Sequence, residues 1–203
     1  MKTAAQIMKG KAHIREELER KLSGSQSRVL WERATMRLET IRSAYADLSG
    51  GVRMHTDHFI FPAAAVYLTV KDAVGQPIAY QVIEESAIRH SLTLGRKLAG
   101  LMKLPGMKSL FVSIWNPLTK KIFGPNSGFR NVFYPKKKGE YRMDIVECPY
   151  CRYFTALGCP ELTKIFCEND ERTYGNLPGI QFLRTTTLGT GGKRCDFCIR
   201  KMH

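Results

Sequence analysis

The chain contains 203 residues and carries a formal charge of +14 at pH 7, from 32 lysine and arginine residues against 18 aspartate and glutamate residues. Because 43% of its residues are hydrophobic and 25% are charged, its composition is that of a folded protein, and intrinsic disorder is excluded as the main state. The longest mostly apolar stretch, residues 59–70, is far shorter than the ~20 residues of a transmembrane helix, so a membrane span is also excluded. The length suits one domain, or one domain with a helical appendage.

Helical patterns fill the N-terminal part of the sequence. The spacing of apolar residues predicts a first helix over residues 1–23, which a Ser-Gly-Ser sequence ends. Apolar steps of four and three between positions 34 and 48 predict a second helix, with a serine as N-cap and Gly50-Gly51 as its stop. We expect an N-terminal helical region over residues 1–50 and an α+β domain over 51–203, or one continuous domain. Packing within the chain is the common use of such helices, but they could also join two copies in a homo-oligomer.

Further helices are predicted over residues 59–104 and 110–123. The Gly75-Gln76-Pro77 sequence divides the first of these stretches into two helices. The helical N-terminal two-thirds of the chain therefore ends near residue 123.

The pattern changes to strands near residue 129. Aromatic and β-branched residues predict a β-hairpin with strands at 129–134 and 141–146. A helical insert over 149–174 follows, and then strands at 181–188 and 195–201, joined by a glycine-rich turn. The predicted fold class is α+β, with the N-terminal helices packed on a C-terminal antiparallel sheet of about four strands that carries a helical insert.

The positive charge is unevenly distributed. Residues 90–142 contain eleven lysine and arginine residues, and Glu140 is their only acidic residue. Such a field attracts phosphates, anionic membrane surfaces or small carboxylate substrates. No nucleic-acid-binding motif accompanies the charge, so we expect a solvated surface rather than a nucleic-acid partner.

The first residues do not have the pattern of an export signal. Met1-Lys2 is a plausible start, but four basic residues interrupt the place of an apolar core segment, and these are Lys9, Lys11, His13 and Arg15. We therefore expect a cytoplasmic protein whose cysteines are reduced. In that compartment six cysteines favour metal binding or catalysis over disulfides.

All six cysteines lie in the last 56 residues, at positions 148, 151, 159, 167, 195 and 198. One interpretation is a zinc site with four thiolate ligands from two CxxC pairs, Cys148, Cys151, Cys195 and Cys198. A second is an active site in which a thiolate is the nucleophile. In a third, several cysteines are small apolar core residues.

The cysteines belong to a series of short motifs. These are E-C-P-Y at 147–150, L-G-C-P-E-L at 157–162, F-C-x-x-D at 166–170, F-x-R-T-x-T-L-G at 182–189 and C-D-F at 195–197. In this order they resemble the L-2-amino-thiazoline-4-carboxylic acid hydrolase family. The resemblance is specific over residues 147–198, and upstream it is limited to a loose agreement of helices.

The resemblance implies a hydrolase that opens a small cyclic amidine-like carboxylate of the thiazoline type. The residues that match the family pattern are Cys148, Cys167, Asp170, Arg184, Cys195 and Asp196. Cys151 and Cys198 are not regular parts of that pattern, which removes two of the four zinc ligands. On this basis no cofactor is expected, with zinc as the alternative.

The chemistry suggests a role for each matched residue. The ring carbon between the sulfur and the two nitrogens is electrophilic, so a thiolate can attack it. We expect Cys167, Cys148 and Cys195 to form the reactive cluster. Asp170 lies one helical turn after Cys167 and would transfer protons. Cys195 pairs more naturally with Cys148, across adjacent strands.

Arg184 and Asp196 are the expected substrate-binding residues. Arg184 could hold the substrate carboxylate in a bidentate pair. In the alternative interpretation, the Arg184 side chain is solvated or forms an ion pair with one of the acidic residues Glu161, Glu168 and Glu171. Asp196 points to the sheet face opposite its cysteine neighbour, so it could instead have a structural role.

A function of a different class stays open at this point. A zinc-stabilised module with four cysteine ligands could present its basic face to nucleic acid or to an acidic partner. His55 and His58, three residues apart, could join a metal or base site, but surface and capping roles are commoner for such a pair.

Overall fold

A computed structural model describes residues 2–135 and 137–202 of the chain. The helical elements are α1 (Ala4–Lys9), α2 (Ala12–Lys21), α3 (Gly24–Ala44), α4 (Gly50–His55), the π-helical turn η1 (Thr56–Ile60), α5 (Phe61–Val74), α6 (Gln76–Met102), α7 (Met107–Ile122), the 3₁₀ turn η2 (Pro125–Ser127), α8 (Pro149–Ala156), α9 (Leu162–Tyr174) and the 3₁₀ turn η3 (Leu188–Thr190). The strands are β1 (Arg130–Phe133), β2 (Glu140–Glu147), β3 (Ile180–Leu183) and β4 (Cys195–Lys201).

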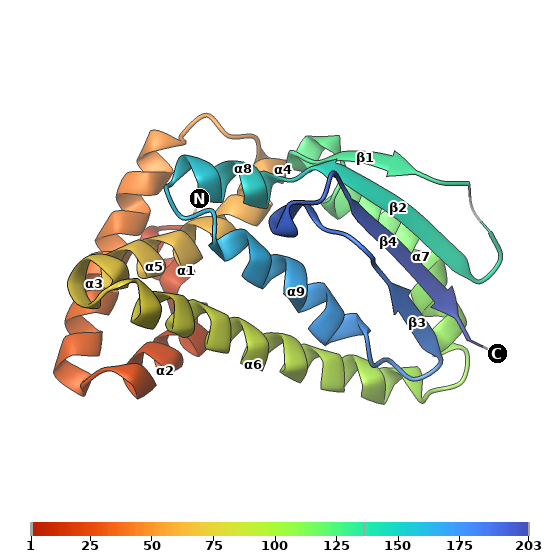
Figure 1. The fold of residues 1–203 in the computed structure, drawn as a ribbon, viewed down its shortest axis with the longest axis horizontal. Coiled ribbons are helices and arrows are strands. Elements are labelled where there is room, and N and C mark those ends of the chain that lie inside the picture. Colours follow the sequence, from red (N-terminus) through yellow and green to blue (C-terminus); the bar gives the residue numbers. More distant parts are fainter. Residues whose placement is uncertain (1, 136, 203) are drawn as a thin grey trace.

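The fold is α+β, as predicted. Helices α1, α2, α3 and α5 gather at one end of the molecule and the sheet lies at the other, while α6 and α9 run side by side along the space between them (Figure 1). The sheet has the strand order β1-β2-β4-β3, and every neighbouring pair is antiparallel. Helices α8 and α9 form the predicted insert between β2 and β3.

Two sequence predictions for the N-terminal helices were wrong. The single helix predicted over residues 1–23 is broken at Gly10, whose N–H caps α1, and α2 starts anew after it. The second predicted helix, α3, ends at Ala44. Gly50 and Gly51 then begin α4 instead of stopping a helix. A side chain at Gly51 would lie 2.2 Å from the Asn126 carbonyl oxygen, so the close approach of α4 to η2 requires glycine there.

The interior is divided into a helical core and a sheet core. The helical core is built around α3, α5 and α6, and its largest fully buried side chains include Tyr67, Phe61 and Phe154. The sheet core lies between α7 and the strands and contains Trp115. Tyr150 packs against both cores, because it lies in α8 where the helical insert leaves the sheet.

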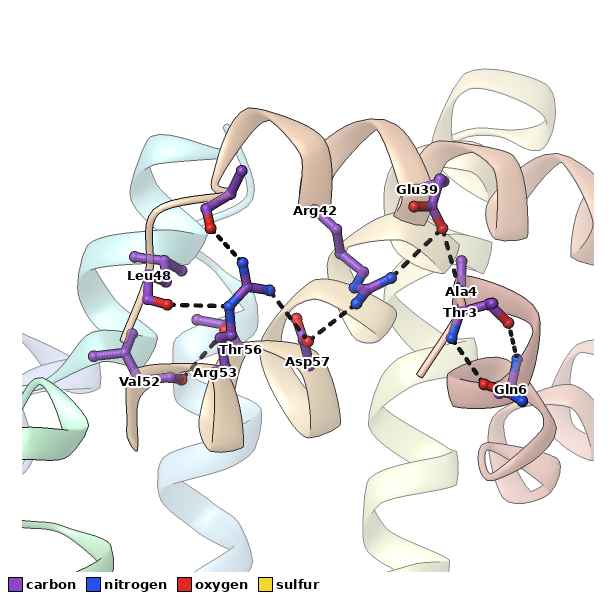
Figure 2. A network of polar contacts seen from close by, with 11 residues as sticks. Thr3, Ala4, Gln6, Glu39, Arg42, Leu48, Val52, Arg53, Thr56 and Asp57 are labelled. Carbon is purple, nitrogen blue, oxygen red and sulfur yellow. Dashed lines mark hydrogen bonds and ion pairs between the residues drawn. The ribbon is translucent and has the colours of Figure 1, made fainter. Parts of the chain in front are cut away.

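A chain of polar contacts attaches α1 to the rest of the molecule. The Ala4 N–H donates to Glu39 on α3 at 3.2 Å, and Glu39 pairs with Arg42 at 3.5 Å. Arg42 in turn pairs with Asp57 of η1 at 3.4 Å, and Arg53 of α4 contacts the same carboxylate at 3.7 Å (Figure 2). Helix α3 is thus paired directly with the π-helical turn, and α1 is linked to that turn through Glu39 and Arg42.

Within the part of the chain that the structure describes, none of the helices has the combination of length and apolar composition that crossing a membrane requires.

Candidate active site

A cavity of about 350 Å³ lies between the helices and the sheet, a size suited to a small ligand. Five of the six residues that match the family motifs line it, and these are Cys148, Cys167, Asp170, Arg184 and Cys195. They come from the end of β2, from α9, from the segment after β3 and from the start of β4. Residues that are far apart in the sequence therefore converge on one cavity.

Strand pairing places the two cysteines at the sheet end of the cavity. Cys148 follows β2 directly and is the N-cap residue of α8. Cys195 is the first residue of β4 and lies opposite Ile145 of β2. Since side chains alternate along a strand, Cys195 faces the sheet core together with Phe197. The predicted adjacency of these two strands is confirmed.

Cys167 has the surroundings of a stabilised thiolate. The Cys195 thiol donates a hydrogen bond to the Cys167 sulfur, and this is the main reason that the pKa of Cys167 is lowered to about 6. Burial opposes the shift, while the Thr187 hydroxyl, the Gly189 N–H and the nearby Arg184 guanidinium add to it. Because the Cys195 thiol is the donor of this pair, its own pKa is raised well above the ordinary value.

The turn η3 wraps closely around these two sulfur atoms. The Leu188 N–H donates to the Cys195 sulfur at 3.3 Å, and the next N–H, that of Gly189, points at Cys167. A Cβ atom at Gly189 would lie 2.7 Å from the Cys167 sulfur. The glycine therefore lets the backbone approach the sulfur closely enough to donate to it.

Asp170 and Arg184 form an ion pair beside Cys167. Arg184 Nη1 lies 3.1 Å from Asp170 Oδ2 and donates at 2.7 Å to the Cys167 carbonyl oxygen. The Arg184 side chain is only 7% exposed, so it is not the solvated arginine of the alternative interpretation. Its acidic partner is also none of the three glutamates considered from sequence. Burial raises the pKa of Asp170 to about 7, although Arg184 acts in the opposite direction.

Cys148 pairs with Cys151 and not with Cys195. The Cys148 thiol donates a hydrogen bond to the Cys151 sulfur, which raises the pKa of Cys148 and lowers that of Cys151. Cys148 also lines a second, more open hollow of about 330 Å³, where Cys151 and Arg152 lie. The site therefore contains two thiol pairs, one on α9 and β4 and one at the start of α8.

The four cysteines of the zinc interpretation do not converge. Cys195 and Cys198 are three residues apart on β4, so their side chains project from opposite faces of the sheet. In the described ranges, no group of three or more His, Cys, Asp or Glu side chains is arranged to hold a metal ion.

Cys159 belongs to the helical core, where burial raises its pKa to about 12.

Asp196 lies outside the cavity lining. Its carboxylate accepts hydrogen bonds from the Thr185 N–H at 2.9 Å, the Thr185 hydroxyl at 2.6 Å and the Thr186 N–H at 2.8 Å. These contacts fix the segment between Arg184 and η3. The residue expected to bind substrate thus holds the backbone that supplies the donors to Cys167.

Several cavity-lining residues were not identified from the sequence. Lys11, His13 and His90 line the cavity together with His58. They belong to the pairing of α2 with α6, a long-range contact for which the sequence has no local signal. Of the two histidines considered from sequence, only His58 lines the cavity. His55 is buried, with its ring nitrogens 3.2 Å from the Tyr150 hydroxyl and 2.7 Å from the Ile122 carbonyl oxygen.

Comparison with known proteins gives one family. Residues 53–199 match the model of the L-2-amino-thiazoline-4-carboxylic acid hydrolase family. A search of curated proteins and a search of solved structures each gave no significant match. The matched range covers α5 to α9, strands β1 to β3, β4 up to Ile199 and every residue of the two thiol pairs. The chain belongs to the L-2-amino-thiazoline-4-carboxylic acid hydrolase family and is therefore a hydrolase of the kind that opens a thiazoline ring.

Proposed function

We propose that this hydrolase opens a small thiazoline-type carboxylate by covalent catalysis, with Cys167 as the nucleophile. The observation that carries the proposal is the environment of the Cys167 sulfur. The Cys195 thiol, the Thr187 hydroxyl and the Gly189 N–H all lower the pKa of this sulfur, which lies beside a carboxyl group in a ligand-sized cavity. A thiolate attacks, whereas a thiol does not.

In the first half of the reaction the Cys167 thiolate forms a bond to the ring carbon that lies between sulfur and the two nitrogens. The electron pair of the carbon–nitrogen double bond moves to nitrogen, which gives a tetrahedral adduct. The adduct collapses as the nitrogen electron pair re-forms the carbon–nitrogen double bond and the ring sulfur leaves, taking a proton from the Asp170 carboxyl group. The opened substrate then remains attached to Cys167 through an amidine carbon.

In the second half a water molecule attacks that carbon. Asp170, now a carboxylate, accepts a proton from the water and returns to its starting state. The carbon–sulfur bond to Cys167 breaks, the thiolate leaves, and the remaining hydroxyl proton passes to nitrogen as the carbonyl group forms. The net change is the addition of one water molecule across the opened ring bond.

The ionisation of the two groups suits this sequence of steps. With a pKa of about 6 for Cys167 and about 7 for Asp170, thiolate and carboxyl group coexist near neutral pH. Arg184 Nη1 donates to the Asp170 carboxyl group and to the backbone carbonyl oxygen of Cys167. Among the described residues, both hydrogen bonds of the Arg184 guanidinium are made by Nη1. Its Nε and Nη2 donors can therefore bind the substrate carboxylate.

The test is incubation of the purified protein with 2-amino-thiazoline-4-carboxylate, followed by mass spectrometry. We expect a product heavier by one water and, on rapid quenching, a covalent adduct on the peptide that contains Cys167. The matched control is Cys198→Ser, which changes a thiol on the opposite face of the sheet. Ring opening by folded Cys167→Ser at the unmodified rate would refute the covalent mechanism.

A further inference from the structure

A second wall of the cavity consists of basic residues. Lys11 at the start of α2, His13 on α2, His58 on η1 and His90 on α6 all line it, and we call these four residues the basic wall. Among the described residues that line the cavity, the only acidic side chain is Asp170, which already pairs with Arg184. The basic wall has no acidic partner inside the cavity.

The members of the basic wall are close together. The rings of His13 and His90 are stacked, with centroids 4.7 Å apart and planes inclined by 27°. The Lys11 ammonium donates a hydrogen bond to the His58 carbonyl oxygen and lies 5.3 Å from the centre of the Phe59 ring. The wall is thus a compact cluster from three separate elements.

Near neutral pH the imidazoles of the cluster are uncharged N–H donors, and the Lys11 ammonium provides its positive charge. Burial is the main reason that the pKa of His13 is lowered to about 4, and repulsion from His90 and Lys11 adds to it. The pKa values of His58 and His90 are lowered by burial and by the same lysine. A bound anion would offset this repulsion and accept hydrogen bonds from the imidazoles and the ammonium.

The basic wall is held in place by the surrounding fold. Asp57, the residue before His58, forms ion pairs with Arg42 and Arg53 in the network that also fixes α1 (Figure 2). His58 itself lies in a π-helical turn, a feature that is frequent at functional sites. Lys11 and His13 precede residue 53, so they are contributed by a part of the chain outside the family match.

We propose that the basic wall is a subsite for a second anionic group of the substrate, a carboxylate or a phosphate. The enzyme would then favour thiazoline carboxylates that carry an additional acidic arm over the simple ring. The proposal rests on the proposed function for the position of the ring at Cys167. Recognition of the arm is a property of α2, η1 and α6 and is independent of turnover.

The experiment measures binding, so that it does not depend on catalysis. Calorimetric titrations compare 2-amino-thiazoline-4-carboxylate acylated on its exocyclic nitrogen with butyrate or with succinate, which differ by a terminal carboxylate. Glutaryl and adipyl arms extend the reach, and arms ending in phosphonate distinguish phosphate from carboxylate recognition. The variants are Lys11→Met and His90→Gln, and Lys9→Met is the control, because Lys9 is exposed on α1 and does not line the cavity.

We expect the unmodified protein to bind at least one acidic-arm ligand about tenfold more tightly than its neutral counterpart, as for a hydrogen-bonded charge. Lys11→Met should remove this preference, His90→Gln should reduce it, and Lys9→Met should retain it. The preference should also fall as salt is added. In NMR titrations the acidic-arm ligand should raise the pKa of His13.

Equal affinity for acidic and neutral arms at every length would overturn the subsite, as would a preference that survives Lys11→Met. If Arg184→Lys weakens binding of the acidic-arm and neutral-arm ligands by the same factor, the preference is independent of the ring site, which would support the subsite. Conversely, absence of turnover with an intact preference would reject the proposed reaction and leave the subsite supported.

Discussion

The two thiol pairs of the active site have the same composition but different surroundings. In one pair Cys195 donates to Cys167, and in the other Cys148 donates to Cys151, so each pair has one sulfur with a lowered pKa. Only for Cys167 do Thr187, Gly189 and Arg184 also lower the pKa. We therefore infer that a neighbouring thiol alone does not make a cysteine the nucleophile of the proposed reaction, and that the backbone of η3 makes the difference.

Removal of the Cys167 sulfur should have the largest effect on kcat. Cys167→Ser is expected to reduce kcat by at least about 10³-fold, because a serine hydroxyl at this position is not ionised. Cys151→Ser, in the other pair, should change kcat by no more than about twofold. Steady-state kinetics on folded proteins checks both values. Equal losses in the two variants would mean that the pairs are equivalent.

The carboxyl group next to Cys167 should control the alkaline side of the pH profile. The thiolate of Cys167 forms as the pH rises through about 6, and the acidic form of Asp170 is lost as it rises through about 7. A plot of kcat/KM against pH should therefore be bell-shaped with its maximum between these values. Asp170→Asn should lower kcat by about 10²-fold or more and remove the alkaline limb. A profile that rises steadily to pH 9 would contradict this assignment.

The close approach of η3 can be disturbed without changing any titratable group. Gly189→Ala places a methyl group 2.7 Å from the Cys167 sulfur and 3.0 Å from Thr163, so one of them must move. We expect kcat/KM to fall by about 10²-fold, the typical effect of a small misplacement. Gly100→Ala, on α6, is the control, because its Cβ would meet no atom within 4 Å. Activity of Gly189→Ala equal to that of the control would show that the turn does not position the sulfur.

The smallest effect is expected from one side-chain donor. Thr187→Val removes a hydroxyl that donates to Cys167, so the pKa of Cys167 should rise and the thiolate fraction at pH 6 should fall by about tenfold or less. Cys151 should be unaffected, because Thr187 does not contribute to its pKa. The measurement is the rate of thiol alkylation at each cysteine. An equal change at both sites would indicate a general loosening of the fold.

The sheet could be predicted because its signals are local. Aromatic and β-branched residues located β1 and β2, and β4 has the bounds predicted for it. The adjacency of β2 and β4 placed Cys148 and Cys195 in the same region. The helix over residues 1–23 was predicted without its break, because the turn at Gly10 depends on how two short helices pack on α3. Local patterns do not specify such contacts.

The site itself was only partly predictable. The motif residues could be named because each one matches a position of the family motifs. The pairing of Cys195 with Cys167, in contrast, depends on where α9 crosses the sheet. The stack of His13 on His90 depends in the same way on the contact of α2 with α6. Asp196 was predicted to bind substrate because it matches the C-D-F motif of the family, whereas its carboxylate accepts hydrogen bonds from Thr185 and Thr186.

The central claim concerns the ionisation of one sulfur, and alkylation by iodoacetamide as a function of pH measures it directly. Mass spectrometry of the digested protein gives a separate rate for each of the six cysteines. We expect Cys167 to react first, with a half-maximal rate near pH 6, while Cys148 and Cys195 stay unreactive until far higher pH. A midpoint for Cys167 at about 8.5, the value of an ordinary thiol, would contradict the account.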